Sequence, residues 1–273
     1  MAEFPTTTDA FLGGQVMLVQ PATDAHRSGS DAVFLAATLR GASGRILDMG
    51  AGAGAVGLMA SHLNPEAEIA LAERDQQMLA CCAKSLERNP TLAARMKVLE
   101  VDLLSAEPKR IACGLQRAAF DHVLSNPPYR RAGHVRSNPA KETAHVVSDS
   151  DLDGWMRTAA SVLKPGGSLT LIFAADGLMD VLAAFKGRFG AVSVLGLHPR
   201  SGVPAERVLI RAIKGRKTPP RLLPGLVVHN EDGSYTAEAR AILDGTASIA
   251  LKGDAPNGET LAPAGSSHHV ERR

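Results

Sequence analysis

Between residues 45 and 125, short β-prone runs alternate with helix-length segments. The β-prone runs cover residues 46–49, 69–72, 96–101 and 121–125, and helix-length segments cover 55–63 and 76–89. This alternation is typical of a parallel sheet whose strands are joined by helices. The sequence therefore predicts an α/β fold with a doubly wound sheet.

The second half of the chain adds further elements to this pattern. We expect a helix over 151–163 that stops at Lys164-Pro165-Gly166-Gly167, and a strand over 168–173. A helix over 177–188 leads to β-prone segments 191–197 and 207–213, which we interpret as a closing hairpin at a sheet edge. Residues 225–238 hold a strand and a turn, and a short helix covers 237–243. The prediction is a seven-stranded, mostly parallel sheet with a small C-terminal appendage.

Two elements precede the alternating region. Residues 12–20 alternate loosely around Gly13-Gly14, which favours a short hairpin or an extended segment. Ser30-Asp31 can cap a helix over 32–39 that ends at Arg40-Gly41. We expect an N-terminal extension with this first helix over 1–41, a main domain with its appendage over 42–251, and a disordered tail over 252–273.

Composition excludes several classes of protein. With 273 residues, 45% hydrophobic and 21% charged, the chain can bury a substantial core and is not predominantly disordered. Cys81, Cys82 and Cys113 have no metal-type spacing, so we expect no metal. A net charge of +2 does not by itself predict a polyanionic partner. Neither a signal peptide nor a membrane span is found, and we expect a cytoplasmic protein.

A glycine-rich turn follows the first strand of the alternating region. It reads Asp48-Met49-Gly50-Ala51-Gly52-Ala53-Gly54 and leads into a helix. Glycines let the backbone approach a ligand closely, and a helix start supplies free N–H donors and a positive dipole end. The turn alone is weak evidence, because many glycine-rich turns are only tight connections.

Two acids downstream strengthen the case for a nucleoside-containing cofactor. Glu73 lies 23 residues after Gly50, at the end of the next strand, where a carboxylate can accept both hydroxyls of a ribose. Asp102 ends the third strand and could accept an adenine amino proton. The alternatives are a solvated polar turn for Glu73 and a helix cap for Asp102.

The strongest signal is Asn126-Pro127-Pro128-Tyr129, which directly follows the strand over 121–125. The two prolines stiffen the loop and remove two backbone donors, so the loop presents carbonyl oxygens. The Asn126 side-chain oxygen and the Pro127 carbonyl can each accept one N–H of an amino group, and Tyr129 can stack on a planar substrate. The alternative is a proline-stiffened turn without a function.

This loop suits methylation of a planar amino nitrogen. Such a nitrogen is a poor nucleophile because its lone pair is spread into a π-system. Two acceptors would hold it in line with a sulfonium methyl group and stabilise the charge that grows on it, which requires positioning and electrostatics rather than a strong base.

At these residues the chain resembles the class I S-adenosylmethionine-dependent methyltransferases. Within them it is similar to the tRNA adenine-N6 methyltransferases that modify adenosine beside the anticodon of a valine tRNA. The likeness runs over residues 11–251. It implies a Rossmann-like fold, S-adenosyl-L-methionine as the methyl donor, tRNA as the partner and Asn126 to Tyr129 as the catalytic loop. The cofactor-binding candidates are Asp31, Asp48, Gly50, Ala51, Gly52, Glu73, Arg74, Asp102 and Leu103.

The resemblance also covers weaker features and has departures. The Gly29-Ser30-Asp31 segment and the Lys141-Glu142-x-Ala144-His145 stretch look like that group, although Ser30 stands where the family more often shows Thr. Aromatic residues make up only 4% of the chain, so recognition of an RNA would have to depend on charge and shape.

Two basic clusters could contact phosphates, or could be solvated faces. The first follows the catalytic loop and supplies our candidate RNA-binding residues, which are Arg130, Arg131, Arg136 and Lys141. The second contains Arg211, Lys214, Arg216, Lys217 and Arg221. We expect Trp155 to anchor its helix in the core, and His145 and His198 to be packed or hydrogen-bonded rather than catalytic.

Three other functions remain open at this point. A protein glutamine methyltransferase of the release-factor type carries the same loop, although those enzymes usually have a longer helical region before the glycine turn. A non-catalytic nucleotide- or RNA-binding module could keep the fold. A nicotinamide-dependent oxidoreductase shares the glycine turn but gives no reason for Asn126-Pro127-Pro128-Tyr129. The sequence does not indicate an oligomeric state.

Overall fold

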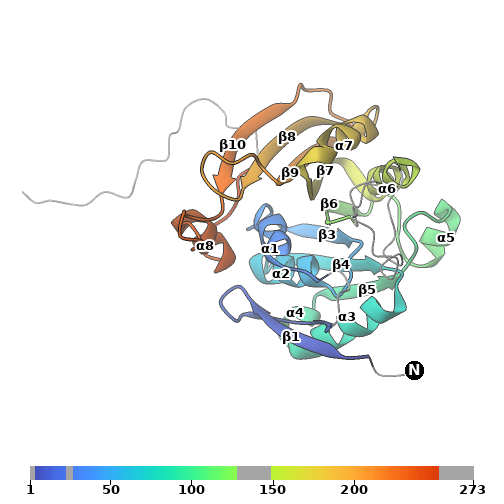
Figure 1. Cartoon of the computed structure of the whole chain (residues 1–273). Coiled ribbons are helices and arrows are strands. Elements are labelled where there is room, and N and C mark those ends of the chain that lie inside the picture. The colour runs from blue at the N-terminus through green and yellow to red at the C-terminus, as the bar shows by residue number, and fades with distance from the viewer. Residues whose placement is uncertain (1–3, 23–26, 128–148, 252–273) are drawn as a thin grey trace, which may run out of the picture.

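The computed structural model of the chain describes residues 4–22, 27–127 and 149–251 (Figure 1). Its strands are β1 (Thr6–Phe11), β2 (Val16–Pro21), β3 (Gly44–Met49), β4 (Ala67–Glu73), β5 (Met96–Glu100), β6 (Phe120–Ser125), β7 (Leu163–Ala174), β8 (Phe189–His198), β9 (Arg207–Lys214) and β10 (Arg221–Val227). Its helices are α1 (Ser30–Ala37), α2 (Ala55–Leu63), α3 (Gln76–Arg88), α4 (Pro90–Ala93), α5 (Glu107–Ala112), α6 (Asp149–Val162), the 3₁₀ turn η2 (Ala175–Gly177), α7 (Leu178–Phe185) and α8 (Ala237–Leu243). The predicted tail over 252–273 lies outside the described residues.

The central sheet contains eight of these strands in the order β10-β8-β9-β7-β6-β3-β4-β5. β9 runs antiparallel to β7 and to β8, and the other neighbouring pairs are parallel. Figure 1 shows β10 at one end of the sheet and β5 near the other. The prediction of a mostly parallel α/β sheet is confirmed.

The eighth strand corrects the expectation of seven strands with the β8–β9 hairpin at the edge. β10 pairs with β8 on its outer side, and its register shifts between Leu223 and Leu226. Pro224 and Gly225 fill that irregularity. Proline lacks a backbone donor and is tolerated on an edge strand, so this segment can extend the sheet although its sequence is a poor strand pattern.

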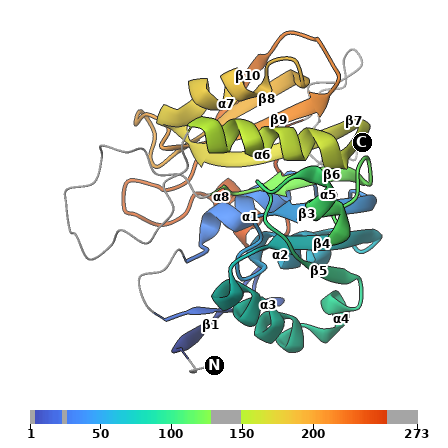
Figure 2. The same cartoon turned by 90° about the vertical axis from the view of Figure 1, so that its right-hand side faces the viewer.

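Helices cover both faces of the sheet, as a doubly wound fold requires. Alternate residues of each strand divide between two hydrophobic clusters. Ile46 and Ile69 pack in the cluster that contains α1 and α2, whereas Leu47 and Val123 pack in the cluster that contains α6 and α7. Figure 2 shows α6 and α7 lying across the sheet. The inner strands β3, β4, β6 and β7 are therefore largely buried on both faces, which explains their apolar composition, whereas the edge strands β5 and β10 are mostly exposed.

Two local predictions were wrong in detail. Ser30 is the first residue of α1 rather than its cap, and Gly29 at the N-cap position forms no side-chain hydrogen bond. The Lys164-Pro165-Gly166-Gly167 segment lies within β7 instead of linking a helix to a later strand. Leu163 already pairs with Phe120 of β6, so pairing with a neighbouring strand extends β7 back to the end of α6.

An N-terminal hairpin of β1 and β2 packs beside α3, which confirms the hairpin interpretation but starts it at Thr6. Two side chains attach β2 to the helix. The Asn89 amide accepts from the Met17 N–H at 3.0 Å and donates to the Met17 carbonyl. The Ser85 hydroxyl accepts from the Val19 N–H at 2.9 Å. Hydrogen-bonding groups on the free edge of β2 are thereby satisfied.

None of the helices in the described ranges is long and apolar enough to cross a bilayer.

Candidate functional site

The carboxyl ends of β6, β3, β4 and β5 lie at one edge of the sheet, because these four strands are parallel and adjacent. Asn126 follows β6, Gly50 follows β3, Glu73 ends β4 and Asp102 follows β5. The strand order brings the glycine turn between Asn126 and Glu73. The topology therefore brings the predicted amine-binding loop next to the predicted cofactor residues.

The glycine turn has the backbone freedom that only glycine supplies easily. Gly50, Gly52 and Gly54 have φ angles of 79°, 54° and 88°. A Cβ atom on Gly50 would lie 2.8 Å from the Trp155 ring, whereas a Cβ atom on Gly52 would meet nothing within 4 Å. Gly50 is therefore required by packing, and the backbone at Gly52 faces open space in which a ligand can approach it. Ala51 is buried between them.

The Glu73 carboxylate is held against this turn. Its Oε2 accepts a hydrogen bond from the Gly52 N–H at 2.8 Å, and its Oε1 accepts from the N–H groups of Arg74 and Asp75, both at 2.8 Å. A carboxylate has about four lone-pair sites. These three bonds fix its orientation and leave capacity for a ribose hydroxyl beside the open face of Gly52.

Asp48 lies beneath the turn instead of facing solvent. Its side chain is buried, and Oδ2 accepts from the Gly57 N–H at 2.8 Å in the first turn of α2. The pKa of Asp48 is raised to about 7. Burial is the main cause, the charge of Glu73 adds to the increase, and the hydrogen bond from Gly57 opposes it. Asp48 would therefore act on a cofactor through the turn that it supports.

Asp102 and Leu103 form the third side of the predicted cofactor site. Asp102 Oδ1 accepts from the Leu104 N–H at 3.0 Å and lies 3.4 Å from Arg74 Nη1. Leu103 is buried, and its carbonyl oxygen accepts from the Thr158 hydroxyl of α6 at 2.7 Å. The Asp102 carboxylate and the apolar Leu103 are thus neighbours. This arrangement fits an adenine, whose amino group can donate to a carboxylate and whose ring can pack against an apolar side chain.

These observations together fit S-adenosylmethionine. An open backbone cradle at Gly52, an oriented carboxylate at Glu73 and the acid at Asp102 match the sulfonium nucleoside's ribose and base in the order of the strands. Within the described ranges, no group of three or more His, Cys, Asp or Glu side chains could hold a metal ion.

Asn126 and Pro127 line a cavity of about 330 Å³ on the other side of the glycine turn. The rest of the cavity is lined by the segment before α1, the start of α1, the end of β7 and the start of β9. Its lining residues are Arg27, Ser28, Gly29, Ser30, Asp31, Ile172, Phe173, Ala174 and Arg207. Asp31, predicted at the cofactor, therefore lies beside Asn126 and is separated from Glu73 by the turn.

The rest of the predicted catalytic loop, Pro128 and Tyr129, lies outside the described residues, and so does His145. The candidate RNA-binding residues Arg130, Arg131, Arg136 and Lys141 lie outside them as well.

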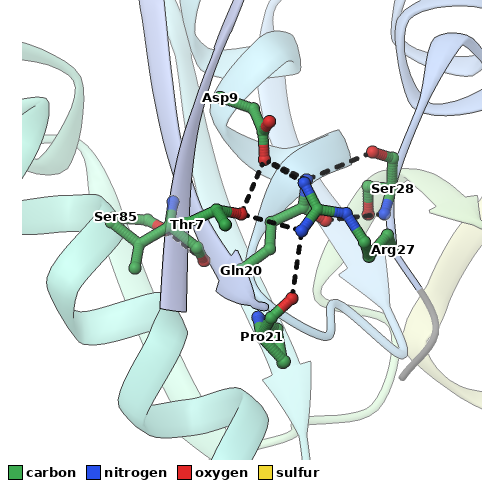
Figure 3. A network of polar contacts seen from close by, with 8 residues as sticks. Thr7, Asp9, Gln20, Pro21, Arg27, Ser28 and Ser85 are labelled. Atoms are coloured by element: carbon green, nitrogen blue, oxygen red, sulfur yellow. Dashed lines mark hydrogen bonds and ion pairs between the residues drawn. The ribbon is translucent and has the colours of Figure 1, made fainter. Parts of the chain in front are cut away.

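A polar network holds one wall of this cavity (Figure 3). The buried Gln20 side chain accepts from the Ser28 N–H at 2.6 Å, donates to the Ser28 carbonyl at 3.2 Å and donates to Asp9 at 3.0 Å. Arg27 donates to Asp9 at 2.7 Å and to Thr7 at 2.8 Å. The N-terminal hairpin thus fixes the course of the chain from Arg27 to α1.

Arg207 was not predicted as a site residue from the sequence. Its Nε donates to Asp31 Oδ2 at 3.1 Å inside the cavity. The two residues are 176 positions apart. β9 runs antiparallel, so its first residue lies at the edge where the parallel strands end, and Arg207 is paired with Ala174. No pattern in the sequence around either residue predicts this contact.

The second basic cluster lies at the opposite edge of the sheet. Lys214 ends β9 beside Phe189 at the start of β8, and its Nζ donates to the Leu163 carbonyl at the start of β7. Arg221 begins β10. These residues are separated from Asn126 by the length of the strands and do not belong to the cavity.

Trp155 is buried and anchors α6, as predicted. His198 Nδ1 lies 2.8 Å from the Val203 carbonyl oxygen, so this histidine is hydrogen-bonded, as expected.

Comparison with known proteins agrees with this geometry. Residues 27–199 match the family model of the methyltransferase small domain. The chain is 30% identical over 217 residues to a tRNA1(Val) (adenine(37)-N6)-methyltransferase of Shewanella amazonensis, which covers 79% of this chain and 83% of that protein. It is 27% identical to the protein of the same name from Shewanella sediminis, over 73% of this chain and 83% of that protein.

Solved structures share the fold. The crystal structure of a predicted O-methyltransferase from Agrobacterium tumefaciens superposes with a TM-score of 0.70 and 32% identity, over 81% of this chain and 98% of that one. M. jannaschii TYW2, crystallised in complex with AdoMet, superposes with a TM-score of 0.52 and 12% identity, over 80% of this chain and 89% of that one. The second likeness concerns the fold alone.

Proposed function

This chain belongs to the methyltransferase small domain family, and on that premise we propose that it transfers the methyl group of S-adenosylmethionine to N6 of an adenine in tRNA. The observation that carries the proposal is the position of Asn126. It directly follows β6, lines a cavity with Pro127, and is adjacent to the strand that leads into the glycine turn. The tRNA substrate is supported by the names of the bacterial relatives, and such a protein would work in the cytoplasm.

We propose that the cofactor is held by the turn and the two strand ends beside it. Glu73 would bind the ribose hydroxyls, the Gly52 backbone would lie against the cofactor, and Asp102 with Leu103 would hold its adenine. Asp48 supports the turn from below. Asp31, predicted at the cofactor, lines the cavity of Asn126 and bonds Arg207, so we propose that it serves the substrate side of the site.

When bound, the cofactor supplies an electrophilic methyl group. The chain's own contribution is to hold the amino nitrogen. Asn126 Oδ1 would accept one N–H and the Pro127 carbonyl the other, which turns the nitrogen lone pair toward the methyl carbon. The donor would give up its methyl group by cleavage of its S–C bond as the new C–N bond forms, and the nitrogen held by Asn126 and Pro127 would then release one proton to solvent. The two oxygens stabilise the positive charge that develops on nitrogen before the proton leaves.

Adenine in an anticodon loop must be turned out of its stack before it can enter a cavity of this kind, at a cost of a few kcal/mol that is smaller for single-stranded bases. The predicted phosphate contacts at Arg130, Arg131, Arg136 and Lys141, and stacking on Tyr129, remain proposals for residues that follow Asn126 in the chain.

A second candidate is methylation of an oxygen, because the Agrobacterium relative is described as a predicted O-methyltransferase. The Asn126-Pro127 geometry favours nitrogen, since an amino group has two hydrogens for two acceptors whereas a hydroxyl has one. A protein glutamine amide also has two, so the loop alone does not separate RNA from protein.

The decisive experiment is transfer of labelled methyl from S-adenosylmethionine to total tRNA that lacks the endogenous modification, followed by nucleoside analysis. We expect N6-methyladenosine. A 2′-O-methylated nucleoside would support the second candidate, and label in protein but not in RNA would identify a glutamine methyltransferase. Absence of label in both fractions would contradict the proposal.

A further inference from the structure

Arg207 lies on the side of the site where we expect the substrate, away from the glycine turn that would hold the cofactor. β9 and β7 stand on the side of β6 that faces away from β3 and β4, and Arg207 begins β9 at the edge where β6 and β7 end. Its side chain lines the cavity of Asn126. The guanidinium group of Arg207 therefore lies at the ends of β6, β7 and β9, whereas the proposed cofactor residues lie at the ends of β3, β4 and β5.

The guanidinium group of Arg207 is held in one orientation. Nε donates to Asp31 Oδ2 at 3.1 Å, and Nη1 donates to the Glu206 carbonyl oxygen at 3.3 Å. Within the described part of the chain, Nη2 has no hydrogen-bond partner, and 48% of the side chain is exposed. An oriented fork of donors with one arm open to a cavity is suited to bind a planar or tetrahedral oxyanion.

Arg27, the other described arginine of this cavity, is hydrogen-bonded to the N-terminal hairpin. Its Nη1 donates to Thr7 and Pro21, and its Nη2 donates to Asp9. Contacts with the N-terminal hairpin therefore already occupy the guanidinium nitrogens Nη1 and Nη2 of Arg27. Arg207 is the described cation of the cavity with an arm left for a ligand.

We propose that Arg207 binds a backbone phosphate next to the target adenosine, with Asp31 as the residue that orients it. This proposal rests on the proposed function. It adds the residue that would fix the position of the RNA backbone on the enzyme. A base turned out toward Asn126 carries its own flanking phosphates to the cavity, and an arginine there that is already held by two hydrogen bonds and has one nitrogen open can fix where the backbone lies. Arg207 thus positions RNA and does not read its sequence.

The test compares Arg207→Gln with Arg216→Gln. Both variants remove one positive charge, and Arg216 is exposed at the opposite edge of the sheet. Dissociation constants are measured for an anticodon stem-loop RNA in the presence of S-adenosylhomocysteine, and separately for S-adenosylhomocysteine alone. We expect Arg207→Gln to weaken RNA binding about tenfold or more, to lower the salt-dependence slope by about 0.7 to 0.9, and to leave S-adenosylhomocysteine binding within twofold. Arg216→Gln should match the wild type.

An RNA with one methylphosphonate beside the target adenosine locates the contact. Against the wild type this neutral linkage should cost as much as Arg207→Gln, and against Arg207→Gln it should cost nothing further, because the two changes remove one interaction. Arg207→Lys keeps the charge without the fork and should retain the salt slope with an intermediate affinity.

Opposite outcomes separate this inference from the proposed function. If the wild type methylates RNA but Arg207→Gln binds it normally, the inference is wrong and the function stands. If Arg207→Gln loses S-adenosylhomocysteine instead, Arg207 serves the cofactor. If the wild type neither binds nor methylates RNA, both are wrong.

Discussion

The indole Nε1 of Trp155 donates a 3.0 Å hydrogen bond to the Ser125 hydroxyl, which in turn donates to the Met49 carbonyl oxygen at 2.6 Å. Ser125 immediately precedes Asn126, and Met49 immediately precedes Gly50. One buried hydroxyl therefore ties the strand that presents the amine-binding loop to the strand that presents the glycine turn, under the cover of α6. This bridge adds a side-chain link to the backbone pairing that already holds β6 beside β3.

Removing the bridge should loosen both halves. Ser125→Ala leaves the Trp155 N–H and the Met49 carbonyl without their shared partner in a buried place, which costs about 1–3 kcal/mol of unfolding free energy. Methyl transfer should fall more than cofactor affinity, since the relative position of the two loops changes. Denaturant unfolding and single-turnover rates measure the two effects. Ser161→Ala, at a half-buried hydroxyl that bonds Glu107 on the surface of α5, is the control; equal effects from both variants would contradict the bridge.

Asn126→Ala should slow turnover strongly while the cofactor still binds. Asn126 lines the substrate cavity and is not among the residues that contact the turn at Glu73. We expect a loss of about 10²–10³ in kcat, comparable to the removal of one oriented polar group from an active site. Isothermal titration with S-adenosylhomocysteine should give a dissociation constant within twofold of the wild type. A parallel loss of binding would move Asn126 to the cofactor.

Glu73→Ala should weaken the cofactor and loosen the turn. The variant removes the carboxylate that accepts from the N–H groups of Gly52, Arg74 and Asp75, and it would also remove the ribose contact. Hydrogen bonds to charged groups contribute about 1.5–3 kcal/mol, so the dissociation constant should rise about tenfold or more. Glu68→Ala, at an exposed carboxylate on the opposite end of β4, should have no effect. Similar affinities for all three proteins would refute the assignment.

Asp48→Asn should raise stability at alkaline pH. The pKa of Asp48 is raised to about 7 in the folded protein by burial, whereas the unfolded chain has an ordinary value near 3.8. A raised pKa stabilises the fold fully below the lower value, and that stability is lost as pH rises through the higher one. At pH 8 the buried charge should cost on the order of 4 kcal/mol.

Asparagine keeps an oxygen that can accept from the Gly57 N–H and carries no charge. The difference in unfolding free energy between Asp48→Asn and the wild type should therefore grow between about pH 4 and pH 8. Thermal melts at half-unit pH steps measure it. A difference that is constant over this range would mean that Asp48 titrates normally.

Gln20→Ala should displace the cavity-lining segment at Ser28, which the polar network of Figure 3 holds. It removes three hydrogen bonds, two of them to the backbone of Ser28, which lines the cavity. We expect a loss of about 1–3 kcal/mol in stability and an increase in KM for RNA larger than the fall in kcat. Gln76→Ala, at an exposed side chain that bonds Glu100, is the matched control. Unchanged KM would show that the hairpin network stabilises the fold without shaping the cavity.

Local sequence determined the elements that build the site. The helix predicted over 55–63 has these bounds in the structure, and the strands predicted over 46–49 and 121–125 begin within two residues of their observed starts. Side-chain periodicity and glycine or proline chemistry act over a few residues, so they are legible along the chain. The same local logic placed Gly50, Glu73 and Asn126 at strand ends, and parallel strands bring their ends to one edge.

Tertiary structure alone decided what lies across that edge. The pairing of Arg207 with Asp31 depends on β9 running antiparallel beside β7. The high pKa of Asp48 depends on burial beneath α2. The eighth strand depends on the pairing of β10 with β8. The position of Lys214 at the edge opposite Asn126 depends on the pairing of β9 with β8. Such contacts are selected by the packing of the whole sheet, and no periodicity in the neighbouring residues encodes them.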